Sequence, residues 1–232
     1  MRPQGDRPVG VSWKRVFDAF PGLDPDVPLR YRPVLERLPR EGRILEIGRG
    51  EVGLAHLRGG PMVTCDIVTP AARAPGEDFV RATGTRLPFR DRSFDWVVAV
   101  DVLEHLPGRL RVNLVGEAAR IAREGIVFAC PCRGSARAES GHRRLLVALR
   151  GHSNPWLEEH RECGLPAEEE ILAAVPSAWR ATTAPNVNLA VWRLNRALVD
   201  VAFRSFRPIA YIGDVLDFGH TYRTVFVLRP VA

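Results

Sequence analysis

Two groups of residues in the sequence have the types and spacing that binding a nucleoside requires. Glu46, Gly48 and Gly50 close a short apolar run, and a Gly-x-Gly turn lets a ligand approach the backbone because no side chain intervenes. A helix that follows such a turn offers free N–H groups to a carboxylate or a phosphate. Asp66 ends the next apolar run, where an acid in a doubly wound sheet accepts hydrogen bonds from the two hydroxyls of an adenosine ribose.

A third group of residues has the types that move protons. Asp101, Glu104 and His105 follow the run Phe94–Val100. Imidazole titrates near neutral pH, which suits a general base that takes a proton from a hydroxyl. We therefore select His105 as the candidate catalytic residue, and a purely structural turn at Glu104-His105 is the alternative.

The same three side chains are of types that bind metal ions. A complete site would need a fourth ligand from the later histidine-rich segment, where His142 and His152 are the candidates. We expect no metal ion in the site and keep this arrangement as an alternative.

The elements that must position these residues alternate between short apolar runs and helical patterns. This alternation is typical of an α/β fold with a mainly parallel sheet covered by helices on both faces. Helical patterns are found at Pro28–Leu38, before the first predicted strand, and at Leu110–Ala122, between the fourth and fifth predicted strands. The predicted strands are Arg43–Ile47, Met62–Asp66, Asp78–Arg81, Phe94–Val100 and Gly125–Ala129.

The second half of the chain is predicted to carry inserted helical cap elements. Cys132–Pro166 shows no clear strand and is interpreted as an irregular block, in which Asn154–His160 forms either the acceptor pocket or a surface loop. Val187–Arg207 is a second amphipathic stretch, a candidate lid, homodimer face or peripheral membrane contact. The remaining predicted elements are a helix at Ala167–Val175 and strands at Trp179–Thr183 and Tyr222–Leu228.

These elements predict the following division of the chain. Residues 1–40 are an N-terminal tail and a cap helix, 41–131 and 167–232 form the core, 132–166 are a cap insertion, and 187–207 are a further helical insertion.

The composition fits one ordinary domain. The chain has 232 residues, of which 46% are hydrophobic, and no uninterrupted apolar stretch is long enough for a membrane span, so we expect a cytoplasmic protein. The net charge of +6 does not by itself favour a nucleic-acid partner, because Lys14 is the only lysine and the arginines are scattered. The spacing of the cysteines matches neither a zinc site nor a redox pair, so we expect free thiols at Cys65, Cys130, Cys132 and Cys163.

Residues 83–107 carry a family resemblance. The motifs Leu87-Pro88-Phe89, Ser93-Phe94-Asp95 and Leu103-Glu104-His105-Leu106-Pro107 resemble a block of small class I S-adenosylmethionine-dependent methyltransferases, of the ubiquinone- and menaquinone-biosynthesis type. The resemblance covers about Arg43 to Ala129 and the final strand. It implies a Rossmann-like seven-stranded sheet with its last strand antiparallel, and S-adenosyl-L-methionine lying across the strand ends.

The resemblance also implies roles for individual residues. Glu46, Gly48 and Gly50 would form the cofactor turn. Asp66 would bind the ribose, and Ile67 would flank the adenine. The other carried-over positions are Thr83 and Gly84 beside the adenine amine, and Val100 and Asp101 beside the methionine moiety and the sulfonium.

The sequence departs from the family pattern in three places. Val52 stands where the family usually has a third glycine, and Gly53 follows it. Thr83 replaces an adenine-side aspartate. The segment Val68–Glu77 is short for the usual helix between the second and third strands.

These observations predict methyl transfer to an oxygen, or a nitrogen, of a small molecule such as a specialised metabolite, a quinone or an envelope sugar or lipid. Two alternatives stay open. One is a non-catalytic partner or ligand-binding protein with a methyltransferase fold, which Val52 and Thr83 motivate. The other is an RNA methyltransferase, which should show a compact basic face and steep salt dependence.

Overall fold

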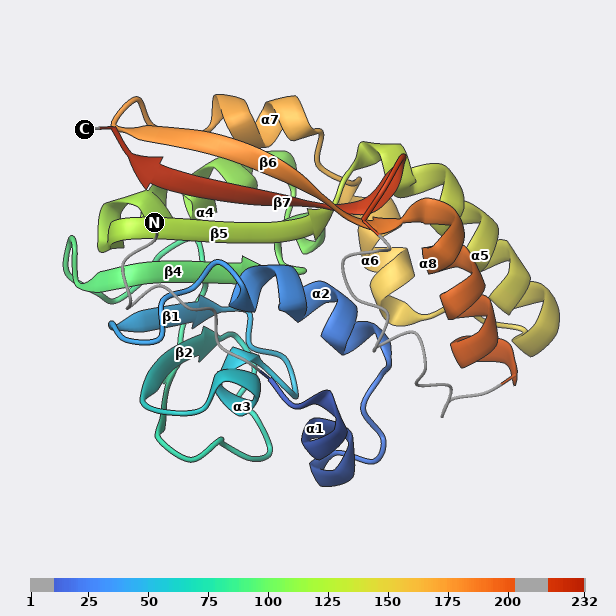
Figure 1. Ribbon diagram of the computed structural model, residues 1–232. Coiled ribbons are helices and arrows are strands. Elements are labelled where there is room, and N and C mark those ends of the chain that lie inside the picture. Colours follow the sequence, from blue (N-terminus) through green and yellow to red (C-terminus); the bar gives the residue numbers. More distant parts are fainter. Residues whose placement is uncertain (1–10, 203–216, 232) are drawn as a thin grey trace.

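The computed structural model describes residues 11–202 and 217–231 and contains one seven-stranded sheet (Figure 1). The strand order is β3-β2-β1-β4-β5-β7-β6, and β7 runs antiparallel to both of its neighbours. The predicted fold class, with its antiparallel last strand, is therefore confirmed. The strands are β1 (Ile44–Ile47), β2 (Met62–Asp66), β3 (Glu77–Arg81), β4 (Phe94–Val100), β5 (Ala122–Pro131), β6 (Trp179–Asn188) and β7 (Thr221–Pro230).

The central strands are buried on both faces, which explains their nearly continuous apolar sequence. All four residues of β1 are buried, and Leu45 pairs with Val63 of β2 on one side and with Val97 of β4 on the other. This parallel register brings the carboxyl ends of β1, β2 and β4 to one edge of the sheet.

Helices cover both faces of the sheet, as predicted. On one face, α1 (Trp13–Ala19), α2 (Asp26–Leu35) and α3 (Leu54–Arg58) share a hydrophobic core with Ile44, Val98 and Val100. On the other face, α4 (Gly108–Ile121) and α7 (Glu168–Ala173) share a second core with Ile47, Val97 and Ala99.

The predicted helical cap elements are present, but Cys132–Pro166 is regular and not the irregular block expected. This segment folds into a 3₁₀ turn η2 (Arg133–Ser135) and two helices, α5 (Ala136–Arg150) and α6 (Pro155–Cys163). Together with α8 (Leu189–Ala197) they lie beyond one end of the sheet (Figure 1). A third small core, which includes Ala138, Trp192 and Tyr222, joins α5 and α8 to β7.

Several predicted boundaries also needed correction. The strand predicted at Trp179–Thr183 continues to Asn188, because residues 184–186 and Asn188 also pair with β7. The helical stretch predicted from Val187 begins at Leu189, and a π-helical turn η3 (Leu198–Ala202) follows it; residues 203–207 lie outside the described residues, as does the predicted tail Met1–Gly10. The short segment between β2 and β3 forms no helix. The division of the chain into core and insertions remains a prediction.

Within the described residues, no helix has the length and apolar character needed to cross a membrane. The four cysteines are free, as predicted, and three of them are buried.

Candidate functional site

A glycine turn closes β1 at the carboxyl edge of the sheet. Gly48 has a φ of +74° and donates its N–H to the carbonyl of Cys65 at 2.9 Å. A Cβ at Gly48 would collide with the side chain of Val102, so only glycine fits there. Gly50 has a φ of +60°, and a Cβ at Gly50 would meet no atom within 4 Å. The turn therefore presents bare backbone to open space at Gly50.

That open space is a cavity of about 630 Å³, which we name the glycine-turn cavity. Its floor is formed by Gly48, Gly50, Val52 and Val100, and the segment between α1 and α2, residues 20–24, forms its other wall. Val52 lines this cavity and does not fill it.

Arg49 stabilises the glycine turn through hydrogen bonds to its backbone. Its guanidinium forms two hydrogen bonds to the carboxylate of Glu77, at 2.6 and 3.0 Å, and it also donates to the carbonyls of Gly50 and Glu51. Both side chains of the ion pair are almost completely buried. Burial would raise the pKa of Glu77, but hydrogen bonds from Arg49, from the Thr64 hydroxyl and from a backbone N–H outweigh it and lower that pKa to about 2.

Glu46 lies behind the turn. Its carboxyl group accepts hydrogen bonds from the first N–H of α3, at Leu54, and from the Tyr31 hydroxyl at 2.9 Å. Burial raises the pKa of Glu46 to about 8 despite these bonds. A Cβ at Gly53 would lie 2.6 Å from a Glu46 oxygen, so this glycine is needed one position after the usual third glycine of the turn.

A second cavity, of about 310 Å³, lies under the cap helices, and we name it the histidine cavity. It is lined by Glu104, His105, Trp156, His160 and Tyr222, together with charged residues from α2, α8 and β7. The two cavities share Asp24, Arg30 and Asp101, so they meet beyond the end of β4.

Asp101 stands at this junction in a left-handed conformation, with a φ of +52°. Its carboxylate accepts hydrogen bonds from Arg30 at 3.1 Å and from Arg223 at 2.8 and 3.0 Å. Burial opposes ionisation, but the two arginines outweigh it and hold the pKa of Asp101 far below its usual range. Asp101 is therefore ionised and held between two arginines.

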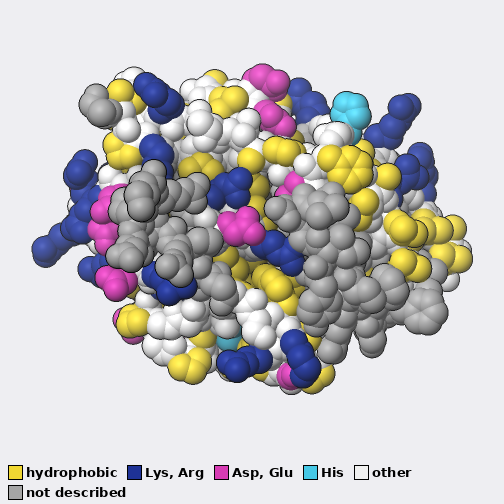
Figure 2. Space-filling model, viewed as in Figure 1, with side chains coloured by type: hydrophobic (Ala, Val, Ile, Leu, Met, Phe, Trp, Pro, Cys, Tyr) yellow, Lys and Arg dark blue, Asp and Glu magenta, His cyan; other side chains and the backbone are white. Residues whose placement is uncertain are grey.

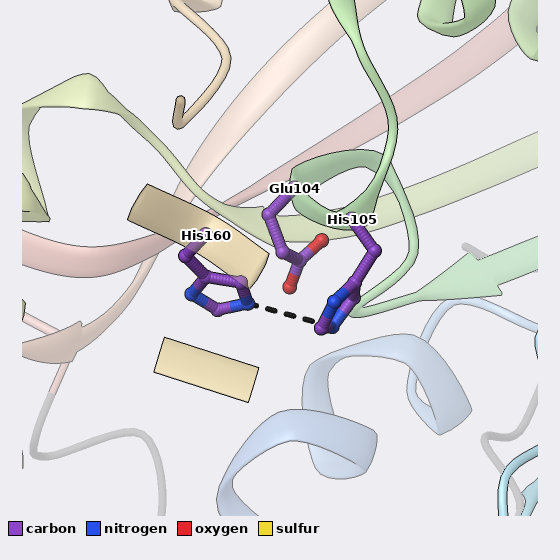
Figure 3. A group of neighbouring side chains, drawn as sticks. All are labelled: Glu104, His105 and His160. Carbon is purple, nitrogen blue, oxygen red and sulfur yellow. Dashed lines mark hydrogen bonds between the residues drawn. The ribbon is translucent and has the colours of Figure 1, made fainter. Parts of the chain in front are cut away.

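Three side chains converge inside the histidine cavity (Figure 3). Glu104 and His105 come from the 3₁₀ turn η1 (Leu103–His105), and His160 comes from α6. The Nε2 atoms of the two imidazoles are 3.4 Å apart, and one ligand atom from each of the three residues lies within 4.8 Å of the others. Burial raises the pKa of Glu104 and, together with His160, lowers the pKa of His105.

Comparison with known proteins supports a specific family. Residues 45–130 match a family model described as a methyltransferase domain. A segment of 56 residues is 45% identical to an uncharacterized methyltransferase of Mycobacterium sp. (strain JLS); it covers 24% of this chain and 21% of that protein.

Solved structures share the fold over most of the chain. One is an S-adenosylmethionine-dependent methyltransferase of Thermotoga maritima, described as a possible histamine N-methyltransferase. It has a TM-score of 0.55 and 16% identity, over 94% of this chain and 95% of that one. Another is the geranyl diphosphate C-methyltransferase of Streptomyces coelicolor A3(2), with a TM-score of 0.52 and 15% identity over 83% of this chain and 73% of that one.

Residues 45–130 form a methyltransferase domain. The predicted methyltransferase family is thus confirmed for this domain. The ubiquinone-type subfamily stays a prediction.

The structure brings four of the predicted cofactor residues of the methyltransferase domain together. Gly48, Gly50, Val100 and Asp101 all line the glycine-turn cavity. Asp66 lies at its rim, because one carboxylate oxygen accepts the N–H of Gly50 at 3.1 Å.

The other predicted cofactor residues do not line the cavity. The side chain of Glu46 faces α3, and Ile67 is 64% exposed beside Asp66. Thr83 is exposed and bonded to Thr85. A Cβ at Gly84 would lie 2.7 Å from Ile47 and 3.0 Å from Leu114, so this glycine serves the packing of α4 on the sheet.

Two of the predicted metal-ligand alternatives were wrong. His142 is bonded to Asp200 at 2.9 Å, and His152 is exposed and bonded to a neighbouring carbonyl. His160 is the histidine that reaches His105. It stands at the end of the segment Asn154–His160, which the sequence marked as a candidate acceptor pocket without assigning a role to this imidazole.

Sequence reasoning also missed the charged residues that organise the site. Arg49 lies inside the glycine turn, where the sequence alone suggests a solvent-exposed arginine. Arg223 lies in a strand of mostly apolar residues. An arginine among buried strand residues is a usable signal, because it must have a buried anionic partner. The partners of Arg223, Asp26 and Asp101, are far away from it in the sequence.

Proposed function

We propose that this protein transfers the methyl group of S-adenosylmethionine to an oxygen of a small molecule that binds in the histidine cavity. The observation that carries the proposal is the meeting of two cavities at Asp101, one beside bare backbone and one beside imidazoles. A nitrogen acceptor is the second choice, because the cavity holds an imidazole suited to assist loss of a hydroxyl proton.

The glycine-turn cavity fits the donor. Its volume of about 630 Å³ is within the usual range for small-molecule sites, about 300–1,000 Å³. Bare backbone at Gly50 and the carboxylate of Asp66 at the rim suit a nucleoside, and the carboxylate of Asp101 suits a sulfonium. The residue that departs from the family pattern, Val52, leaves this space open.

The acceptor side supports methyl transfer to a hydroxyl. The donor's methyl group is strongly electrophilic, so the protein's main tasks are to align the acceptor and to exclude water. The half-buried Trp156 and the buried Tyr222 supply aromatic walls for the acceptor. His105 is the residue placed to assist loss of the acceptor's proton.

Isothermal titration with S-adenosylmethionine tests the donor site. We expect the wild-type protein to bind it, and Gly50→Ala to weaken binding at least tenfold because the new Cβ would enter the cavity. Gly151→Ala is the matched control: Gly151 also has a positive φ, of +77°, and open space around it, but it caps α5 away from the cavity. Equal affinities in the two variants would contradict this assignment of the cavity.

Transfer of a labelled methyl group to a panel of hydroxyl and amine compounds tests the acceptor. No uptake of S-adenosylmethionine by the wild-type protein would instead support the non-catalytic alternative. Labelling of RNA rather than of small molecules would support the RNA alternative.

A further inference from the structure

Each imidazole of the histidine cavity is oriented by a carboxylate that contacts its Nδ1 atom. Nδ1 of His105 is 2.6 Å from an oxygen of Glu159, and Nδ1 of His160 is 3.0 Å from an oxygen of Glu139. Glu139 is itself fixed by the Tyr222 hydroxyl at 2.7 Å. An ionised carboxylate only accepts hydrogen bonds, so each Nδ1 carries a proton, and in a neutral ring the Nε2 then presents a lone pair.

These two lone pairs face each other. The Nε2 atoms are 3.4 Å apart, the contact that Figure 3 marks, and a hydrogen lies between them only when one ring carries a second proton; two neutral rings have none to share. A cation held between them removes the repulsion. Two nitrogens on one tetrahedral Zn²⁺, with bonds of about 2.0–2.1 Å, stand about 3.3–3.4 Å apart. On an octahedral Mg²⁺, with bonds of about 2.1 Å, adjacent ligands would be only about 3.0 Å apart.

Glu104 supplies an independent indication. Its side chain is 0% exposed, and within the described part of the chain neither carboxylate oxygen has a hydrogen-bond partner. Buried polar groups are nearly always paired, and a buried carboxylate without a partner is costly. Figure 3 shows this carboxylate pointing toward the space between the two imidazoles. A cation there would satisfy it.

We propose that Glu104, His105 and His160 bind a divalent cation of the zinc type in tetrahedral geometry. Two histidines and one glutamate leave a fourth position open, as catalytic zinc sites do. The Glu159–His105 and Glu139–His160 pairs form the outer shell that fixes ring orientation in such sites.

The open position gives the site a function, which rests on the proposed methyl transfer. It faces the histidine cavity, where the acceptor hydroxyl would coordinate and lose its proton to water, because a bound cation stabilises the oxyanion. That oxygen then forms a bond to the methyl carbon, and the electron pair of the breaking carbon–sulfur bond stays on sulfur. His105 would thus assist the proton loss as a ligand, and the acceptor class would be a hydroxyl compound.

Metal analysis of the untagged full-length protein tests the site. After removal of metals by a chelator, the protein is titrated with Zn²⁺, Mg²⁺ and Co²⁺. We expect one equivalent of Zn²⁺ per chain by mass spectrometry, and a visible absorption spectrum of tetrahedral Co²⁺. A wild-type protein that retains no Zn²⁺ and gives no such spectrum, or that takes up Mg²⁺ alone, overturns the proposal.

Variants locate the cation. Glu104→Gln and His160→Gln should each weaken Zn²⁺ binding at least about 100-fold, because each removes a ligand. Glu139→Gln should weaken it about 10–100-fold, because Glu139 orients the ring of His160. His152→Gln is the matched control, because His152 is exposed and lies outside the cluster. Equal losses in His152→Gln and His160→Gln would place the metal elsewhere. If a ligand variant fails to fold, the wild-type Co²⁺ spectrum still decides.

A donor titration on the metal-free protein separates this proposal from the proposed function. Binding of S-adenosylmethionine without any uptake of Zn²⁺ would leave the methyltransferase assignment standing and end the metal proposal. Uptake of Zn²⁺ without binding of S-adenosylmethionine would support the metal site and contradict the methyltransferase assignment.

Discussion

Arg49 is the residue on which the shape of the glycine turn depends most. It sits between Gly48 and Gly50, and its guanidinium reaches under the turn to Glu77 on β3. Arg49→Met would leave the buried Glu77 carboxylate without its charge partner. Removing one member of a buried ion pair costs about 3–5 kcal/mol, so we expect the free energy of unfolding in urea to fall by that amount.

The double variant Arg49→Met/Glu77→Gln is the control for this prediction. It removes both charges, so it should be more stable than Arg49→Met alone. A single variant as stable as the wild type would show that the pair does not hold the turn.

The same ion pair predicts a stability loss in acid. The pKa of Glu77 falls from an ordinary 4.5 in the unfolded chain to about 2 in the folded protein. A lowered folded-state pKa means that the stabilisation is complete above pH 4.5 and is lost as the pH falls toward about 2. We expect the difference in unfolding free energy between the wild type and Arg49→Met/Glu77→Gln to shrink over that interval. A difference that is constant between pH 5 and pH 2 would contradict it.

Among the elements, α4 fixes the turn that carries Glu104 and His105. Arg111 on α4 is 3% exposed and donates to the carbonyl of Leu103 in η1 and to Glu170 of α7. It also donates to the carbonyls of Cys163 and Gly164 at the C-terminal end of α6. One side chain thus joins the ends of three elements around the histidine cavity.

Arg111→Met should disturb the cavity and the fold together. Each buried acceptor left without a donor costs about 1–3 kcal/mol, so we expect a loss of about 3 kcal/mol or more in thermal or urea unfolding, and weaker Zn²⁺ binding. Arg109→Met on the same helix is the control, because Arg109 is exposed. Similar effects of the two substitutions would argue against Arg111 as the common support.

The elements differ in how well the sequence predicts them. The strands of the core are buried on both faces, so apolar runs such as Phe94–Val100 identify them directly. Helix α5 escaped prediction because its buried face is not apolar: Glu139 and His142 are buried on it beside Ala138 and Leu146. A pattern of hydrophobic residues cannot reveal a helix whose buried face carries ionisable residues.

The candidate site was predicted in the same uneven way. The turn at Gly48–Gly50 and the acids after the strands follow from local sequence. The pairing of His105 with His160 joins residues 55 positions apart, and it depends on where α6 lies. Such contacts are fixed by tertiary packing, and no local pattern specifies them.

At the scale of the whole molecule, the mixed charges on the face in Figure 2 predict a weak response to salt. On the face that Figure 2 shows, the described Lys and Arg side chains are interspersed with acidic and apolar ones. We expect the rate of methyl transfer to a small acceptor to change less than about twofold between about 50 and 200 mM KCl. An RNA-binding protein with several phosphate contacts would lose about 10³–10⁵ in affinity over the same interval. A steep fall would favour the RNA alternative.

The left-handed backbone at Asp101 limits what protein engineering can do at the junction of the two cavities. Glycine, asparagine and aspartate are the residues that adopt a φ near the observed +52° at low cost. Of these, only aspartate also carries the negative charge that Arg30 and Arg223 face. Substituting glycine to relax the chain would remove the carboxylate that Arg30 and the buried Arg223 share, so at this position thermostability and an intact binding surface demand the same amino acid.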